Sequence, residues 1–241
     1  MRSIFLFLFI ILTANLSAQN DCVDALVVCG DTNFNNIQVN GPGLLQEVRS
    51  CGSQEYNSIW MKLNIATAGI LAFTITPQST NINEDFDFYL YSYVSCDDRD
   101  IIRCSTTNPA AAGLSNNRTG LNDAENDLNE GPGQDGNSYV QSVIVNAGET
   151  YMLVVDRASG TSNFSITWTG TATFNQPPQI QLPTAGTSMD LSECDIDGVP
   201  DSSTAFDLTQ NTPLIIGTQM NVAVTYHTSE SDALLGVNEI L

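Results

Sequence analysis

The stretch Asp85-Phe86-Asp87-Phe88-Tyr89-Leu90-Tyr91 decides the fold class of this chain. Successive side chains of an extended backbone point to opposite faces, so Phe86, Phe88 and Leu90 share one face and the residues between them share the other. This period of two predicts a β-strand with one apolar face turned toward a core. The aromatic content supports the same interpretation, because aromatic residues are enriched in strands.

Other segments of the chain have the same strand character. Turns rich in Gly, Asn and Pro separate them, and none shows a sustained helical period. Short strands spaced in this way are typical of an antiparallel β-sandwich, so we expect an all-β fold. Residues 105–138, rich in Asn, Gly, Asp and Ala, are expected to form a long loop of the kind that is functional or mobile. The further expected strands are 59–65, 70–76, 139–145, 150–156 and 164–174.

Residues 1–19 predict a cleaved secretory signal peptide. Arg2 is the charge of a short n-region, residues 4–12 form an apolar run, and Ser17 and Ala18 supply small residues for cleavage. The run is too short to span a bilayer as a helix. No other stretch approaches 18 apolar residues, so no membrane span is expected in the mature, exported chain.

The charge balance restricts the partners. The chain carries 27 acidic and 7 basic residues, for a formal net charge of −20. Such a surface repels duplex nucleic acid and anionic membranes, so nucleic-acid binding is not expected. With 42% hydrophobic and 14% charged residues, the chain is expected to fold. The acidic excess suits an extracellular protein, and it also suits divalent cations.

The 6 cysteines predict disulfides, because the chain is expected to be exported to an oxidising compartment. Cys96 and Cys104 bracket residues 97–103, which are expected to form a loop that a disulfide would staple, and they form the best local pair. Cys22, Cys29 and Cys51 are expected to hold a second bridge, whose connectivity stays open. Cys194 follows a proline-rich boundary and has no obvious partner.

That boundary divides the chain. The boundary is marked by Gln176-Pro177-Pro178 and Pro183. We therefore expect a β-sandwich domain at 20–176, and a linker with a second β module at 177–241. Within the second module, strands are expected at 179–182 and 220–227. Roughly 60 residues are marginal for an independent β domain, so this module is expected to be the start of an incomplete β-sandwich-like repeat.

The first domain resembles the N-terminal domain of large secreted proteins of Bacteroidetes, and is similar to the pre-peptidase C-terminal type of jelly-roll sandwich. The resemblance implies a jelly-roll β-sandwich for residues 20–176. The residues that carry it are Asn57-Ser58-Ile59-Trp60, 69–77, 85–91, 102–105, 119–121, 147–151 and 168–172.

The second module resembles the tandem repeats that follow in the same proteins, which lead to a type IX secretion sorting domain often labelled gliding-motility-associated. The resemblance implies export across the outer membrane by the type IX machinery, through a sorting domain absent from these residues. In the full pattern, a later cysteine could pair with Cys194. The matching residues are 194–195, 197–198, 206–209, 222–227 and 231–233.

Asp195, Asp197 and Asp201 are the candidate metal ligands. Their D-x-D-G-x-x-D spacing is that of calcium loops, in which alternate carboxylates point at one centre. Phe206 stands where an EF-hand would have its twelfth-position Glu, so a solvated acidic turn is the alternative. The expected loop 105–138 also allows two interpretations, a calcium site or a flexible acidic segment. Its acidic residues are Asp123, Glu125, Asp127, Glu130 and Asp135.

Aromatic residues offer a second kind of candidate site. Tyr89, Tyr91 and Tyr93 could stack on sugar rings, but cross-strand packing is the favoured interpretation. Trp60 and Trp168 lie on apolar faces and are expected in the core.

The sequence contains no recognisable catalytic constellation. His227 is the only histidine, so a zinc triad lacks ligands, and no G-x-S-x-G elbow occurs. We therefore expect a non-catalytic, adhesin-like protein of the outer cell surface or medium, with glycans or surface proteins as partners. The alternative is the accessory N-terminal region of a larger secreted hydrolase, whose catalytic domain lies elsewhere.

Overall fold

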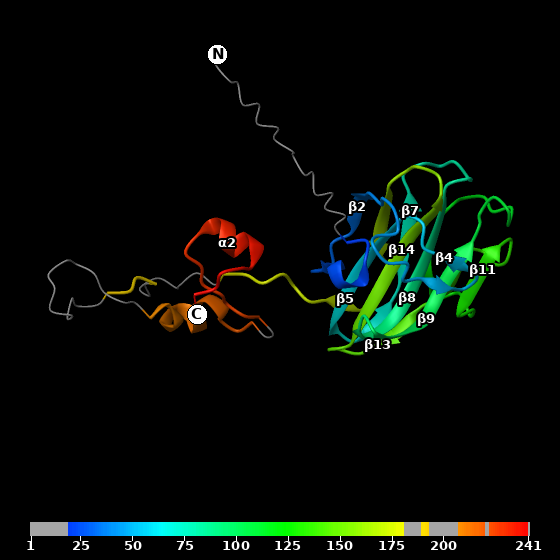
Figure 1. Cartoon of the computed structure of the whole chain (residues 1–241). Helices are drawn as coiled ribbons and strands as arrows, with labels where there is room; N and C mark the ends of the chain where they lie inside the picture. The colour runs from blue at the N-terminus through cyan, green and yellow to red at the C-terminus, as the bar shows by residue number, and fades with distance from the viewer. Residues whose placement is uncertain (1–18, 181–188, 193–206, 220–221, 241) are drawn as a thin grey trace, which may run out of the picture. The chain divides into compact units, whose positions relative to one another are not determined.

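The structure is a computed structural model that describes residues 19–180, 189–192, 207–219 and 222–240 (Figure 1). The chain divides into two compact units, Met1–Gln176 and Pro177–Leu241. Residues 1–18 of the expected signal peptide lie outside the described residues, as do the expected calcium ligands Asp195, Asp197 and Asp201.

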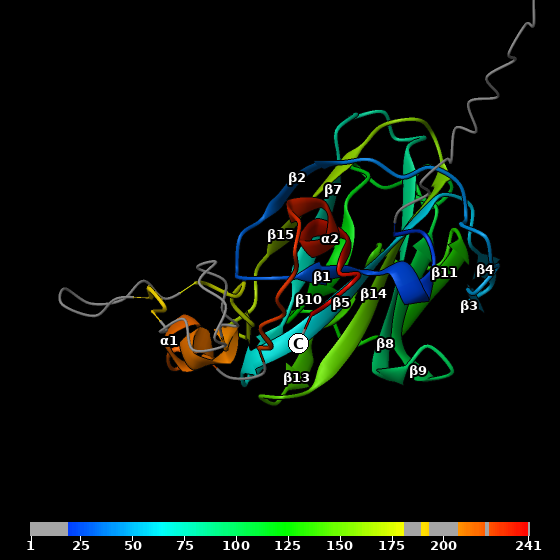
Figure 2. The ribbon, with the colours of Figure 1, turned by 60° about the vertical axis from the view of Figure 1, so that its left-hand side comes forward.

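The first unit contains a seven-stranded and a five-stranded sheet (Figures 1 and 2). In the larger sheet the order is β1-β5-β14-β8-β9-β11, and β16 also pairs with β5. Its strands are β1 (Leu26–Val28), β5 (Ser58–Thr67), β8 (Asp85–Ser95), β9 (Asp98–Thr107), β11 (Asn129–Gly133), β14 (Thr150–Ser159) and β16 (Thr173–Phe174).

The smaller sheet has the order β12-β10-β7-β15-β2. Its strands are β2 (Phe34–Ile37), β7 (Phe73–Pro77), β10 (Thr119–Asn122), β12 (Tyr139–Gln141) and β15 (Phe164–Trp168). The remaining elements of the unit are a 3-10 turn η1 (Cys22–Asp24) and the two-stranded pairs β3 (Arg49–Ser50) with β4 (Ser53–Gln54), and β6 (Gly69–Leu71) with β13 (Val143–Val145).

The main core lies between the two sheets. Phe88 of β8 meets Phe73 of β7 edge to face, with ring centroids 5.2 Å apart, and Phe86 meets Phe164 of β15 at 5.3 Å. Four of the deepest residues come from strands of opposite sheets, since Leu63 and Leu153 belong to the larger sheet and Ile75 and Ile166 to the smaller. The prediction of an all-β sandwich is therefore confirmed.

The outer face of the seven-stranded sheet is also buried. Trp60, Tyr89 and Tyr91 form a second apolar cluster with Met152 and Val154. Residues 44–57, here called the covering segment, contribute Val48 and Cys51 to this cluster. Tyr89 and Tyr91 are 0% and 7% exposed, so neither ring is accessible to a sugar. Both residues pack against neighbouring strands, as the favoured interpretation of the sequence predicts.

Two expectations about the loops are wrong. The segment between Cys96 and Cys104 belongs mainly to β9, which pairs with β8 along most of its length. Residues 105–138 are not one continuous loop, because β9 extends to Thr107 and both β10 and β11 lie inside the range. Glu130 of β11 is 4% exposed, so this acidic segment is partly anchored in the sheet.

In the second unit, the described residues form short helical elements that lie outside the two expected strands, and residues 181–182 and 220–221 of those strands lie outside the described residues. These are η2 (Leu208–Asn211), α1 (Thr212–Ile216) and α2 (Glu230–Leu235). The expected strand 220–227 appears, over its described part, only as an isolated bridge between His227 and Glu239. Ser229 caps α2 by accepting the amide hydrogen of Asp232, which is the usual role of a serine at that position.

Candidate functional site

Four cysteines of the first unit form two disulfides. Cys22 pairs with Cys96 and Cys51 pairs with Cys104, with Cα–Cα distances of 5.8 and 6.5 Å. The expected Cys96–Cys104 pair is wrong for a geometric reason. Cys96 lies in the β8–β9 turn, whereas Cys104 pairs with Tyr89 far down the hairpin. At about 3.3 Å per residue their separation is about 20 Å, beyond the roughly 7 Å that a disulfide spans.

Cys29 is the remaining cysteine among the described residues, and it is exposed and free. It lies beside the end of the first unit. The backbone amide of Gly30 donates to the carbonyl of Asn175 at 2.8 Å, and Asp31 Oδ1 accepts from the amide of Phe174 at 2.9 Å. The Cys29 thiol is therefore close to the point at which the chain leaves this unit.

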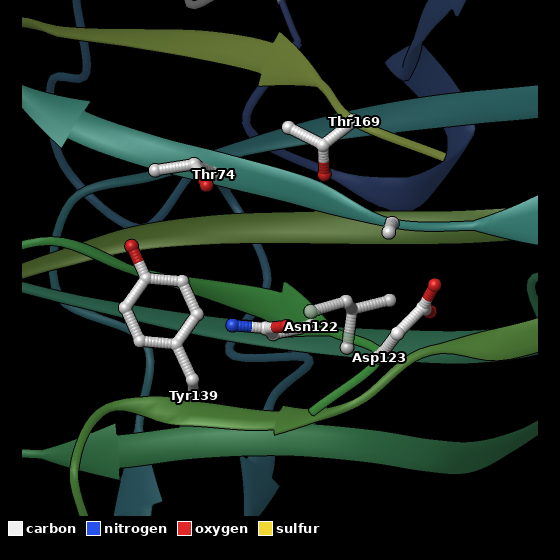
Figure 3. Close-up of a pocket in the computed structure, with 7 residues that line it drawn as sticks. Thr74, Asn122, Asp123, Tyr139 and Thr169 are labelled. Carbon is white, nitrogen blue, oxygen red and sulfur yellow. The ribbon is translucent and has the colours of Figure 1, made fainter. Parts of the chain in front are cut away.

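A depression of about 260 Å³ opens at the end of the five-stranded sheet where β7 begins and β10 and β15 end (Figure 3). Figure 3 shows the Tyr139 ring on one side of it, Asp123 on the other and Asn122 between them. The Thr74 and Thr169 hydroxyls complete the polar lining. The full lining, here called the groove, is Ala72, Thr74, Leu121, Asn122, Asp123, Tyr139 and Thr169.

The strands explain how these side chains come together. β7 alternates, so Phe73 and Ile75 are buried while Thr74 is only half-buried. Gly120 of β10 stands opposite Thr74 on one side and Tyr139 of β12 on the other. A side chain at Gly120 would collide with the Phe73 carbonyl, so glycine allows the close approach of β10 and β7.

The groove combines an aromatic surface with neutral and acidic polar groups. Burial raises the pKa of Tyr139 above its ordinary value, although a hydrogen bond with Thr74 opposes the shift, so the phenol remains neutral. Asn122, Asp123 and Thr169 are exposed and offer oxygen and nitrogen atoms to a ligand. The groove therefore offers a ligand one aromatic ring together with hydroxyl, amide and carboxylate groups.

Buried carboxylates hold several loops of the first unit. Glu130 Oε2 accepts from the amides of Asn137 and Ser138, at 2.9 and 2.7 Å, and so fixes the turn that leads to Tyr139. Asp21 Oδ1 accepts from Leu44 and Leu45 at 3.0 and 2.9 Å. Within the described ranges, no three His, Cys, Asp or Glu side chains are grouped so that they could hold a metal ion.

The sequence predicts Asp123 in an acidic segment and a strand that begins at Tyr139, but no sequence pattern indicates that these two residues lie in one groove. The groove takes residues from β7, β10, β12 and the segments that follow β10 and β15, so only the sheet order reveals it. His227 is placed in the second unit, where Nδ1 lies 2.8 Å from the Val237 carbonyl oxygen.

Comparison with protein families found one match. A family described as the Flavobacterium inter-domain disulphide bond domain matches residues 190–241. No curated protein and no solved structure matches the chain. Together with the two disulfides, the family match indicates a Bacteroidetes protein of the extracellular space or periplasm. In the part of the chain that the structure describes, no helix is long and apolar enough to cross a membrane.

Proposed function

We propose that this chain is part of a non-catalytic, adhesin-like surface protein whose first unit binds neutral glycans in the groove. The observation that carries the proposal is the Tyr139 ring flanked by amide, hydroxyl and carboxylate groups on an open sheet surface. An aromatic ring can pack on the apolar face of a sugar while the surrounding polar groups hydrogen-bond its hydroxyls.

The charge of the chain favours neutral ligands over anionic ones. Asp123 lies in the groove, and the whole chain has a formal net charge of −20. Sulfated or uronic-acid polysaccharides would meet unfavourable electrostatics at such a surface. Neutral sugars escape this repulsion, and their hydroxyls can donate to the Asp123 carboxylate.

A glycan array with the mature chain tests this function. We expect binding to neutral oligosaccharides that is lost in Tyr139→Ala and partly retained in Tyr139→Phe, which keeps the ring. Tyr56→Ala is the matched control, because Tyr56 is 44% exposed and does not line the groove. Absence of any glycan signal, or equal signals from the wild type and Tyr139→Ala, would refute glycan binding in the groove.

We further propose that Cys29 and Cys194 form a disulfide that joins the two units covalently. Cys29 is left free by the other four cysteines of the first unit, and it lies beside the end of that unit. Cys194 falls within the match to the inter-domain disulphide family. It follows Gln176 by 194 − 176 = 18 residues, which reach about 60 Å when extended, so the connection is long enough.

The bond would form by exchange with the disulfide of an envelope thiol oxidoreductase. The two thiols lose two electrons and two protons, and the oxidoreductase disulfide is reduced to a dithiol. Non-reducing peptide mapping of the secreted chain should yield one cross-linked peptide that contains both Cys29 and Cys194. A free Cys29 thiol, or Cys194 linked to another cysteine, would contradict this pairing.

A further inference from the structure

Two aspartates face each other across the centre of the seven-stranded sheet. Asp87 of β8 and Asp156 of β14 are direct partners in the antiparallel register, and they are 2% and 0% exposed. Direct partners carry their side chains on the same face, with Cβ atoms about 4.5–5.5 Å apart. Two ionised carboxylates in this position would repel each other strongly because both are shielded from water.

Each of these carboxyl groups has one oxygen atom without a partner. Asp156 Oδ1 accepts from the backbone amides of Tyr56 and Asn57, at 2.9 and 2.6 Å. Asp156 Oδ2 and Asp87 Oδ1 are buried and have no hydrogen-bond partner. The Tyr89 hydroxyl, also without a close partner, lies against Asp87. Buried polar atoms are rarely left unpaired, so these oxygens call for an explanation.

The groups around the pair supply no positive charge. Asp85 and Tyr89 lie on the same face of β8, and the covering segment brings Ser53 and Glu55. On β9, Thr106 follows Ser105, which is the register partner of Phe88. Ser58 of β5 stands opposite Asp156 on its other side, and its hydroxyl donates to the Asn20 carbonyl at 3.4 Å. Asn108 donates to Asp85 at 2.9 Å.

Arg157 follows Asp156 in β14, and its side chain therefore points to the opposite face of the sheet. There its guanidinium donates to the carbonyl oxygens of Ser162 and Val39, at 2.9 and 3.2 Å. The charge of the aspartate pair is therefore left without a cationic partner among the described neighbours.

We propose that Asp87 and Asp156 share one proton, with Asp87 as the carboxylic acid that donates to Asp156 Oδ2. A single proton satisfies both unpaired oxygens and removes the repulsion. The assignment follows from the donors, because the two backbone amides stabilise the anion of Asp156 and no backbone amide donates to Asp87.

The electrostatics of the site agree with this assignment. Burial raises the pKa of Asp87 well above its ordinary value, and the neighbouring Asp85 and Asp156 raise it further, against a smaller opposing effect of hydrogen bonds with Ser53 and Tyr89. Burial also raises the pKa of Asp156 to about 6, although its amide donors act in the opposite direction.

The shared proton secures the covering segment. Asp156 holds the amides of Tyr56 and Asn57, and Thr106 of β9 donates from its hydroxyl to the carbonyl of Cys51 at 2.7 Å. When the proton is lost at high pH, two buried negative charges remain beneath residues 51–57. The covering segment then loosens while the Cys51–Cys104 disulfide keeps it attached.

Carboxyl ¹³C NMR of the full mature chain tests the proposal directly, and it needs no variant. At neutral pH the Asp87 carboxyl signal should have the shift of a protonated acid and that of Asp156 the shift of a carboxylate. Amide exchange of Tyr56 and Asn57 should accelerate as the Asp87 signal titrates. Two ionised signals at neutral pH, or a signal that responds to added calcium ions in place of protons, would overturn the proposal.

Variants provide an independent measurement. In Asp87→Asn the side-chain amide can donate to Asp156 without a proton. The melting temperature of this variant should therefore lose most of the decline that the wild type shows as the pH rises above about 4, the ordinary pKa of an aspartate. Asp156→Asn replaces the carboxylate that accepts from the Tyr56 and Asn57 amides with a neutral amide oxygen, so it should melt lower than Asp87→Asn at neutral pH. The control is Asp97→Asn in the exposed β8–β9 turn. An Asp87→Asn profile parallel to that of the wild type would refute the shared proton.

Discussion

Glu84 is 7% exposed, and its Oε2 atom accepts from the backbone amides of Thr161 and Ser162, both at 3.0 Å. Its burial favours the neutral acid, but these hydrogen bonds and the charge of Arg157 outweigh it and lower the pKa. A lowered pKa means that the carboxylate is more stable in the folded than in the unfolded chain. The stability from Glu84 is therefore present above the unfolded pKa and is lost as pH falls through the lower, folded pKa.

We predict that Glu84→Gln destabilises the first unit by about 1–3 kcal/mol at neutral pH, because hydrogen bonds to a charged acceptor are replaced by weaker ones. Urea unfolding followed by tryptophan fluorescence measures the loss, which should shrink as the solution is acidified. Asp97→Asn serves as the exposed control. A Glu84→Gln variant as stable as this control would show that the loop 160–162 does not depend on the charge.

The groove shows what single residues can and cannot reveal in a sequence. Tyr139 was correctly expected at the start of a strand, and Asp123 was correctly counted among the acids of its segment. Tyr139 and Asp123 lie close together because β10 pairs with β12 in parallel, and no local sequence pattern predicts that pairing. Glu130 has the same appearance in the sequence as the exposed acids beside it, yet it is buried.

At the scale of elements, the strands with regular alternation were predictable and those without it were not. β5, β8 and β14 each contribute an apolar face to the core, and the residue pattern predicted all three. β9 escaped prediction because Asp98, Arg99 and Asp100 interrupt its apolar pattern before the buried end at Cys104. Without β9 the hairpin register was unknown, and the wrong cysteine pair followed from that.

The Cys51–Cys104 disulfide ties the covering segment to β9 and closes a loop with a sequence separation of 53. We predict that the double variant Cys51→Ser and Cys104→Ser loses about 2–5 kcal/mol of stability, since the unfolded chain regains the entropy that the bond removes. Chemical denaturation of the oxidised proteins measures this. Asp97→Asn in the exposed β8–β9 turn leaves every disulfide intact and is the control, and equal stability of the two variants would contradict the assigned pairing.

At the scale of the whole molecule, composition predicted the fold class of the first unit but not the structure of the second. The sandwich follows from many short strands, whereas the described residues of 177–241 form η2, α1 and α2. The expected strand around residues 222–227 has the β-branched content of a strand but finds no ladder partner within the described residues beyond the His227 bridge. Propensity alone does not create a sheet, because each strand needs a neighbour.

We predict that the mature protein begins at Gln19 or Asn20. The Asn20 side chain donates to the carbonyls of Asn40 and Gly41, at 2.6 and 3.1 Å, and Asp21 holds the amides of Leu44 and Leu45. Cleavage after Asp21 would remove both anchors of the first unit. N-terminal sequencing of protein from the culture medium or cell surface identifies the first residue. A start within the apolar run 4–12, or an uncleaved Met1, would contradict the signal peptide.

The two disulfides also determine how the first unit would respond to a pulling force. A surface protein that holds a ligand in flowing water is stretched along its chain. The Cys22–Cys96 bond carries the load across a sequence separation of 74, so the intervening chain stays slack even after the sheets separate. At about 3.4 Å per residue, about 250 Å of contour length is withheld from extension. Stretched by its ends, the oxidised first unit would extend only through the residues that follow Cys96, up to Gln176, and it would lengthen fully only after reduction.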